Sequence, residues 1–294
     1  MHDDRMTGVK ARSWKKVAFF YGMTLLFSGV FEALDLRAPG NITLITGMMW
    51  CPALSAVLTQ WVFGDSVRGL GWSWGSGRYQ IWAYVIPLFY ALPVYVIVWF
   101  TGLGGFYDTV FVARVSKEFG LSGLPMAAGL IGYFLLAATA GFIPKTARAL
   151  GEEIGWRGFL VPELAKVTNF AGVGFISGIL WAAWHFPSIL FGNYNAGTPS
   201  WYALTCFTVM VVAGSFIAAW LRLRSRSVWP AAILHGSHNL FIQLILTPVT
   251  VDTGWTAYVI DEFGAGLAVT NVIGAIIVWR RRAELGPIPL EPPR

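Results

Sequence analysis

The sequence predicts an all-α, polytopic membrane protein. Of its 294 residues, 56% are hydrophobic and only 12% are Asp, Glu, Lys or Arg, whereas a soluble domain carries about 25% charged residues. Its 15 Trp and 33 Gly residues fit this class, because Trp anchors helices at membrane interfaces and Gly permits close helix packing. The composition excludes an ordinary soluble enzyme and a disordered chain.

Eight apolar segments reach the length of about 20 residues that a membrane span needs. Glu32 is the only Asp, Glu, Lys or Arg within them. The first is expected to be a retained helix and not a cleaved signal peptide, because no small-residue cleavage site follows it. The segments are 17–34, 42–63, 81–103, 124–142, 170–190, 201–221, 228–246 and 263–279.

The basic residues predict the orientation of these spans. With the N-terminus inside, every Lys and Arg except Arg37, Arg114 and Lys117 falls on the cytoplasmic side, as the positive-inside rule requires. We therefore expect a multi-pass protein of the cell membrane with both termini cytoplasmic, and no nucleic-acid partner. Residues 143–166 are assigned to a cytoplasmic connection. The chain has no repeat or linker, so 1–294 is predicted to be a single transmembrane domain, with a disordered tail at 283–294.

Polar residues at membrane depth are candidates for function because burying them is costly. They gather in three clusters, at 151–158, 181–185 and 235–239. Glu153 and Arg157 are four residues apart on a helix and can form an ion pair. Glu152 is turned about 100° away and stays free for chemistry.

The other two clusters supply His185 and the pair His235 and Asn239, which are four residues apart and project together. A carboxylate, a histidine and a His/Asn pair that converge can activate a water and stabilise an oxyanion, as amide hydrolysis requires. Each cluster also has a structural interpretation: a solvated helix end, a hydrogen-bonded core histidine, or a polar contact between helices. For His238, on a different face from His235, the structural interpretation is favoured.

Taken in order, the clusters resemble a known family. The stretches GEEIGWRGFLVPEL (151–164), WAAWH (181–185) and ILHGSHNL (233–240) are similar to the three motifs of the CPBP intramembrane endopeptidases, the CaaX protease and bacteriocin-processing (Abi) family. This family includes the type II CaaX prenyl endopeptidases. The resemblance covers residues 124–246, the expected catalytic core of four helices, and departs from the pattern where Trp181 replaces the usual Phe.

The resemblance implies a role for each matching residue. Glu152 would activate the attacking water together with His185, and His235 with Asn239 would bind the oxyanion. Glu153 and Arg157 would hold the first motif in shape. The implied substrate is a membrane-associated, lipidated or leader-bearing protein or peptide, cut by an intramembrane endopeptidase near the cytoplasmic side of the lipid bilayer.

Metal dependence stays open on the sequence, since the family has been described both as metallopeptidases and as glutamate-dependent peptidases. Glu152, His185 and His235 would supply three ligands to Zn²⁺. Against zinc, the histidines lack a paired spacing and Asn is a poor zinc ligand. The balance slightly favours a metal-free site.

Two other function classes compete with the endopeptidase. One is a non-catalytic membrane scaffold or immunity protein, which would be free to lose motif residues that this chain retains. The other is a proton-coupled transporter with Glu152, His185 and His235 as a relay, although the sequence has no inverted repeat.

The predicted topology also separates Glu152, in a cytoplasmic connection, from His185, about 22 Å along the fifth span. They meet only if the segment with Glu152 is sunk into the bundle or the fifth span begins below the membrane.

Overall fold

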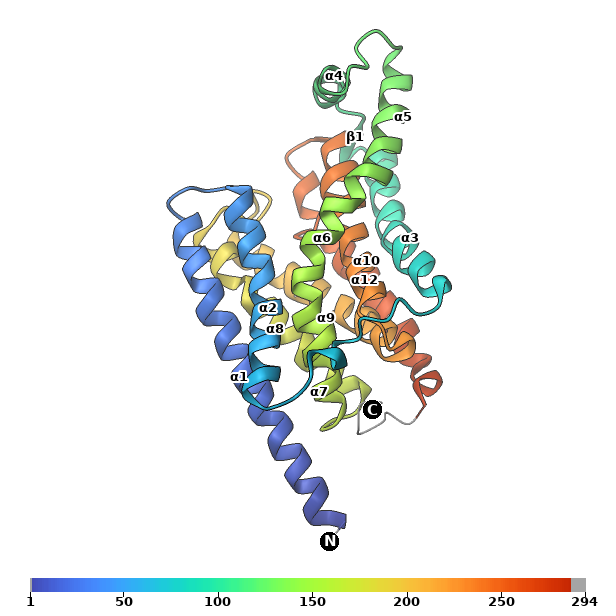
Figure 1. The fold of residues 1–294 in the computed structure, drawn as a ribbon. Helices are drawn as coiled ribbons and strands as arrows, with labels where there is room; N and C mark the ends of the chain where they lie inside the picture. Colours follow the sequence, from blue (N-terminus) through green and yellow to red (C-terminus); the bar gives the residue numbers. More distant parts are fainter. Residues whose placement is uncertain (1, 287–294) are drawn as a thin grey trace.

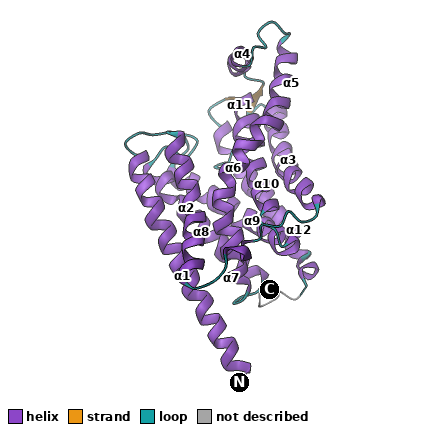
Figure 2. Ribbon diagram, in the orientation of Figure 1, coloured by secondary structure: helices purple, strands orange, loops and turns teal. Residues whose placement is uncertain are grey.

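The computed structural model describes residues 2–286, which form a bundle of helices with one small pair of strands (Figures 1 and 2). Its helices and helical turns, in chain order, are α1 (His2–Asp35), α2 (Ile42–Val62), η1 (Val67–Leu70), α3 (Gly77–Thr101), α4 (Thr109–Glu118), α5 (Met126–Leu136), η2 (Ala137–Gly141), α6 (Phe142–Glu153), η3 (Ile154–Leu160), α7 (Val161–Ala165), α8 (Phe170–Phe191), α9 (Ser200–Ser225), α10 (Trp229–His238), η4 (Asn239–Leu246), α11 (Thr247–Val249), η5 (Thr256–Tyr258), α12 (Ala265–Arg280) and η6 (Arg282–Leu285). The strands β1 (Gly104–Phe106) and β2 (Thr250–Asp252) pair antiparallel.

Six helices of the described chain are long and apolar enough to cross a membrane, which confirms the all-α membrane class. They are Thr7–Asp35, Ile42–Val62, Gly77–Thr101, Met126–Ala165, Phe170–Phe191 and Ser200–Ser225, and each overlaps one of the first six predicted spans. The last two predicted spans are also helical, but they are more polar or shorter than the first six. The run α10–η4–α11 carries the polar His-x-x-x-Asn motif, and the apolar helix α12 has only 16 residues. The count of eight spans stays a prediction.

The assignment of residues 143–166 to a connection is wrong, because these residues continue a helix. The segments from α5 to α7 follow one another without a break as a helical run of 40 residues, Met126–Ala165, with π-helical turns at η2 and η3. Hydropathy hides this helix, since the charges of Glu153 and Arg157 make it look solvated although both side chains are buried.

Because this helix is continuous, Glu152 no longer has to lie at a different membrane depth from His185. After a short turn, α8 begins at Phe170, where the side chain of Asn169 caps the helix by accepting from the backbone N–H of Gly172. At 1.5 Å per residue, Glu152 lies about 20 Å before the end of the run and Trp181 about 17 Å after the start of α8. The first and second motifs therefore lie at similar depth on neighbouring helices.

The third motif is brought to this depth by packing in the middle of the bundle. Helix α10 packs against α6 and α3, while α9 lies between α8 and α12 (Figure 1). The beginning of α1 and the end of α12 lie at one end of the bundle (Figure 1). There, the Arg12 side chain of α1 bonds to the carbonyl of Phe63 and to Asp65 after α2. Of the predicted disordered tail, residues 287–294 lie outside the described residues.

Close contact between α2 and η3 depends on Gly155. A Cβ at this position would lie 2.5 Å from Cβ and 2.7 Å from the carbonyl oxygen of Pro52. We expect Gly155→Ala to lower the free energy of unfolding by about 1–3 kcal/mol, because the Pro52 backbone has to move. Thermal unfolding in detergent measures this, with Gly22→Ala as the control. A Cβ at Gly22 has no neighbour within 4 Å, and the more helix-favouring Ala should leave stability unchanged or raised. Equal melting for both variants would contradict the close packing.

Candidate active site

The six predicted site residues line one cavity of about 500 Å³ in the middle of the bundle. The end of α6 and the start of η3 supply the first motif, α8 the second, and α10 with the first residue of η4 the third. The six residues are Glu152, Glu153, Arg157, His185, His235 and Asn239. The structure thus brings together, in one place, residues that are up to 87 positions apart in the numbering of the chain.

Glu153 and Arg157 form the predicted ion pair, with Nη1 of Arg157 2.8 Å from Oε1 of Glu153 and both side chains 1% exposed. A second guanidinium nitrogen, Nη2, donates to Oγ of Ser215 on α9 at 3.0 Å. The guanidinium also lies 4.1 Å from the ring centroid of Trp181 on α8. Arg157 therefore links η3 to α9 and α8, as expected of a residue that positions other groups.

Glu152 is buried as well, but it forms no ion pair with any residue that the structure describes. Its Oε2 accepts a hydrogen bond from the indole Nε1–H of Trp181 at 2.8 Å. Trp181 stands where the family pattern has Phe, and a phenyl ring could not donate this bond. The carboxylate is thus held in place by a neutral donor and keeps its remaining lone pairs for a proton.

His185 is oriented by its own helix. Its Nδ1 lies 2.9 Å from the carbonyl oxygen of Trp181, one turn earlier. Because a carbonyl only accepts, Nδ1 carries the proton and the neutral ring presents Nε2 as an acceptor. Aromatic rings enclose the imidazole, with Trp184 at 4.6 Å and Phe207 at 4.9 Å between centroids. Tyr194 lies in a stacked orientation at 6.1 Å.

His235 is oriented by a carboxylate. Its Nδ1 lies 3.0 Å from Oε1 of Glu153, the oxygen that also pairs with Arg157. Nδ1–H is therefore the donor, and a protonated ring also presents Nε2–H. Asn239, one helical turn further, is buried and lines the same cavity. The pair can direct N–H donors at one point, as an oxyanion site requires.

The donor set does not fit a metal ion. Among residues 2–286, no three His, Cys, Asp or Glu side chains come together as ligands would. Zinc needs three protein ligands converging at about 2 Å, so no step of the chemistry is derived through a metal.

Comparison with known proteins agrees with this geometry. The family model of type II CAAX prenyl endopeptidases, described as Rce1-like, matches residues 130–241, which contain all three motifs. Through this core, the chain is similar to the CPBP, CaaX-protease-like family. A CAAX prenyl protease 2 from Methanococcus maripaludis is 35% identical over 107 residues, which cover 35% of this chain and 38% of that protein. The chain therefore matches little more than a third of the length of its curated relative.

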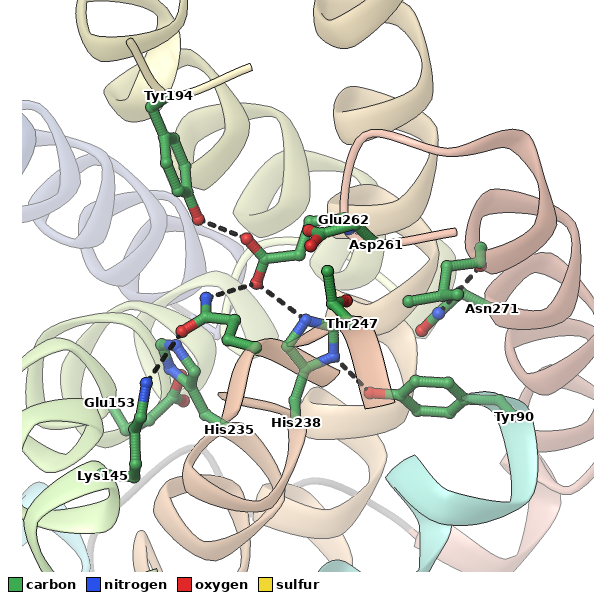
Figure 3. Close-up of polar contacts among 12 residues, drawn as sticks. Tyr90, Lys145, Glu153, Tyr194, His235, His238, Thr247, Asp261, Glu262 and Asn271 are labelled. Carbon is green, nitrogen blue, oxygen red and sulfur yellow. Dashed lines mark hydrogen bonds and ion pairs between the residues drawn. The ribbon is translucent and has the colours of Figure 1, made fainter. Parts of the chain in front are cut away.

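Beside the motifs of this CaaX-protease-like core lies a second polar network that the sequence analysis missed (Figure 3). Nδ1 of His238 lies 2.6 Å from the hydroxyl of Tyr90, and its Nε2 lies 2.9 Å from Oε1 of Glu262. Glu262 also accepts from the hydroxyl of Tyr194 and from Nε2 of Gln243. The structural role predicted for His238 agrees with these contacts. The available signal was the acidic pair Asp261-Glu262, directly before an apolar helix.

The two acids of this network, both outside the six long helices, differ in charge. Burial raises the pKa of Asp261, and the neighbouring carboxylate of Glu262 adds to the rise. Burial acts the same way on Glu262, but hydrogen bonds from His238, Tyr194 and Gln243 outweigh it, and the pKa of Glu262 is lowered. Glu262 therefore carries the negative charge of the pair, and Asp261 takes up a proton first as the pH falls.

Proposed function

We propose that this chain is an intramembrane endopeptidase that hydrolyses a peptide bond of a membrane-associated protein or leader peptide. The observation that carries the proposal is the Glu152 carboxylate. It is buried without an ion pair to any residue from 2 to 286, and it lines the same cavity as His185, His235 and Asn239. The relative from Methanococcus maripaludis is named as a CAAX prenyl protease, which supports a lipidated protein as one substrate class.

In the proposed reaction, Glu152 takes a proton from a water molecule in the cavity, and Nε2 of His185 accepts a hydrogen bond from the same water. The water oxygen attacks the carbonyl carbon of the scissile bond. Asn239 and the Nε2–H of protonated His235 stabilise the negative oxygen of the tetrahedral intermediate. The proton held by Glu152 then passes to the leaving nitrogen, the C–N bond breaks, and the two peptide termini are released.

Glu153 and Arg157 take no part in this proton transfer. Their ion pair fixes the helix turn that carries Glu152, and Oε1 of Glu153 holds the ring of His235. The adjacent glutamates therefore have different roles: Glu152 takes part in the chemistry, and Glu153 positions the other groups.

We also propose a cell-membrane location with both termini in the cytoplasm. The basic residues at the start of α1 and after α12 support it by the positive-inside rule. They include Lys10, Lys15 and Arg282. The cavity extends to the loops at the other end of the bundle, where it is lined by Asn193 and Asp261. In this orientation, the loop end of the cavity faces away from the cytoplasm.

The function is tested by comparing newly formed peptide termini in two sets of membranes at equal expression. One contains the wild-type chain, and the other contains the double variant Glu152→Gln, His185→Gln. We expect termini that arise only with the wild type, and these identify the substrates without a prior guess. Identical termini in both sets, with both proteins folded and a broad set of host membrane proteins present, would favour a non-catalytic scaffold or a transporter. Measuring proton flux in vesicles would then distinguish those two.

A further inference from the structure

Glu262 is a buried carboxylate beside the site that has no role in the proposed reaction (Figure 3). It lies in the loop before α12 and lines the central cavity. Its Oε2 accepts from the hydroxyl of Tyr194, and its Oε1 accepts from Nε2 of His238 at 2.9 Å and from Nε2 of Gln243 at 3.0 Å. Glu262 also lies outside residues 130–241, the region that the family model matches. The three motifs therefore leave this group unexplained.

The loop that carries Glu262 is itself held by several contacts. The hydroxyl of Tyr95 accepts from the backbone N–H of Asp261 at 3.2 Å, and Oδ1 of Asp261 accepts from the backbone N–H of Glu262 at 2.6 Å. Phe263 is buried, and its ring centroid lies 4.8 Å from that of Tyr194. Asp261 has a φ of 66°, a left-handed conformation that is uncommon outside glycine and persists where surrounding contacts enforce it. The carboxylate is therefore presented from a fixed support.

One arm of this network ends beside His185. The ring of Tyr194 lies in a stacked orientation against the imidazole of His185, with the centroids 6.1 Å apart. Tyr194 comes from the loop between α8 and α9, and loops move more than the helices they connect. Its bond to the Glu262 carboxylate fixes the ring, because a hydrogen bond to a charged acceptor is strong. The ring then limits how far the imidazole can turn away from the attacking water.

The other arm ends at the third motif. Nδ1 of His238 lies 2.6 Å from the hydroxyl of Tyr90 on α3, so contacts with Tyr90 and Glu262 hold both ring nitrogens. His238 is the last residue of α10, and Asn239 is the first residue of the π-helical η4. Such π-helical turns occur frequently at functional sites. Holding His238 on both sides fixes the junction from which Asn239 projects into the cavity.

We infer that Glu262 is a positioning residue of the endopeptidase reaction. This inference rests on the proposed function. Through Tyr194, Glu262 holds the imidazole of His185 on the water-activating side, and through His238 it holds Asn239 on the oxyanion side. One carboxylate that accepts from three donors thus keeps both sides of the site in a single arrangement. Because a misplacement of about 1 Å can lower a rate by about 10²-fold, this role acts on kcat and leaves substrate binding unchanged.

The test measures kcat and KM of the full chain in proteoliposomes. The substrate is a synthetic peptide that spans a cleavage site identified from the new termini of wild-type membranes. Glu262→Ala removes the acceptor of all three donors, and we expect kcat to fall about 10–100-fold with KM nearly unchanged. Tyr194→Phe removes only one bond and should lower kcat about three- to tenfold.

Two further variants test whether the hydrogen bonds cause the effect. Glu262→Gln should retain most of the wild-type kcat, because its amide oxygen replaces Oε1 and its NH₂ group donates to the hydroxyl oxygen of Tyr194. The double variant Glu262→Ala, Tyr194→Phe should have the kcat of Glu262→Ala alone, because both changes remove the same bond.

Tyr202→Phe is the matched control for Tyr194→Phe. The hydroxyl of Tyr202 on α9 also bonds to the segment before α12, donating to the carbonyl oxygen of Tyr258 at 2.6 Å. Tyr202 does not line the cavity, so its loss of a hydroxyl should leave kcat and KM unchanged.

Thermal unfolding in detergent accompanies each measurement, and kcat is referred to the folded fraction. Unchanged kcat in folded Glu262→Ala and Tyr194→Phe would leave the network a purely structural role and overturn the inference. A raised KM with kcat retained would also overturn it, because Glu262 would then bind the substrate directly. If Glu262→Ala does not fold, the comparison of Tyr194→Phe with Tyr202→Phe decides. Wild-type membranes without new termini would instead contradict the endopeptidase function.

Discussion

Glu152→Gln is expected to lower kcat by about 10²–10⁴-fold, the contribution of a positioned acid–base group. The substitution keeps the size of the side chain, and its amide oxygen still accepts the bond from Trp181 Nε1. It removes only the ability to take and return a proton. The measurement is kcat of the purified chain on a substrate identified from its new termini, together with thermal unfolding in detergent.

The control for this prediction is Glu118→Gln, the same chemical change on an exposed residue of α4. It should leave both kcat and the melting temperature unchanged. If Glu152→Gln retained more than about a tenth of the wild-type kcat, Glu152 would not be the group that activates water. A large fall in melting temperature with Glu152→Gln would equally contradict the division of tasks between the adjacent glutamates.

That division shows what the spacing of residues in the sequence can predict. A separation of four residues on a helix was enough to predict the pairing of Glu153 with Arg157 and the separate position of Glu152. Both follow from local helix geometry, which does not depend on the rest of the fold. The order of the motifs predicted that they lie on three helices, and the packing of α10 against α6 and of α8 against η3 brings them together.

Hydropathy alone could not predict the course of the chain between the first two motifs. Residues 143–166 contain Lys145, Arg148, Arg157 and Lys166, a pattern typical of a cytoplasmic connection. The structure shows that Arg157 is buried in an ion pair and that two of the other cations line the cavity. Because a buried, paired charge has the same hydropathy value as a solvated one, the distinction required the tertiary contacts.

The sequence could not predict the hydrogen-bond network around Glu262 for a related reason. Its members Tyr90, Tyr194 and His238 lie on separate elements and have no fixed spacing from one another. Only the packing of α3 and the loop before α12 against α10 brings their polar atoms within hydrogen-bonding distance. In sequence, Tyr90 appears as one more aromatic residue of an apolar helix and Tyr194 as a loop residue, and neither shows which polar group it will meet.

Arg157→Ala is expected to have the largest effect on stability, lowering the free energy of unfolding by about 3–5 kcal/mol. The substitution leaves the Glu153 carboxylate buried with His235 as its remaining partner in the described chain. It also removes the bond to Ser215 and the contact with the Trp181 ring. Thermal unfolding in detergent measures the loss, and the melting temperature should fall well below that of Glu152→Gln.

Arg281→Ala provides the matched control. Arg281 also forms an ion pair within one helical turn, with Glu284, but its side chain is 55% exposed. Solvent screens such a pair and already hydrates each charge, so its loss should leave the melting temperature nearly unchanged. The two variants therefore separate the cost of an unpaired buried carboxylate from the loss of an arginine as such. Comparable melting of Arg157→Ala and Glu152→Gln would mean that the ion pair does not support the site, and Glu153 would lose its assignment as a positioning residue.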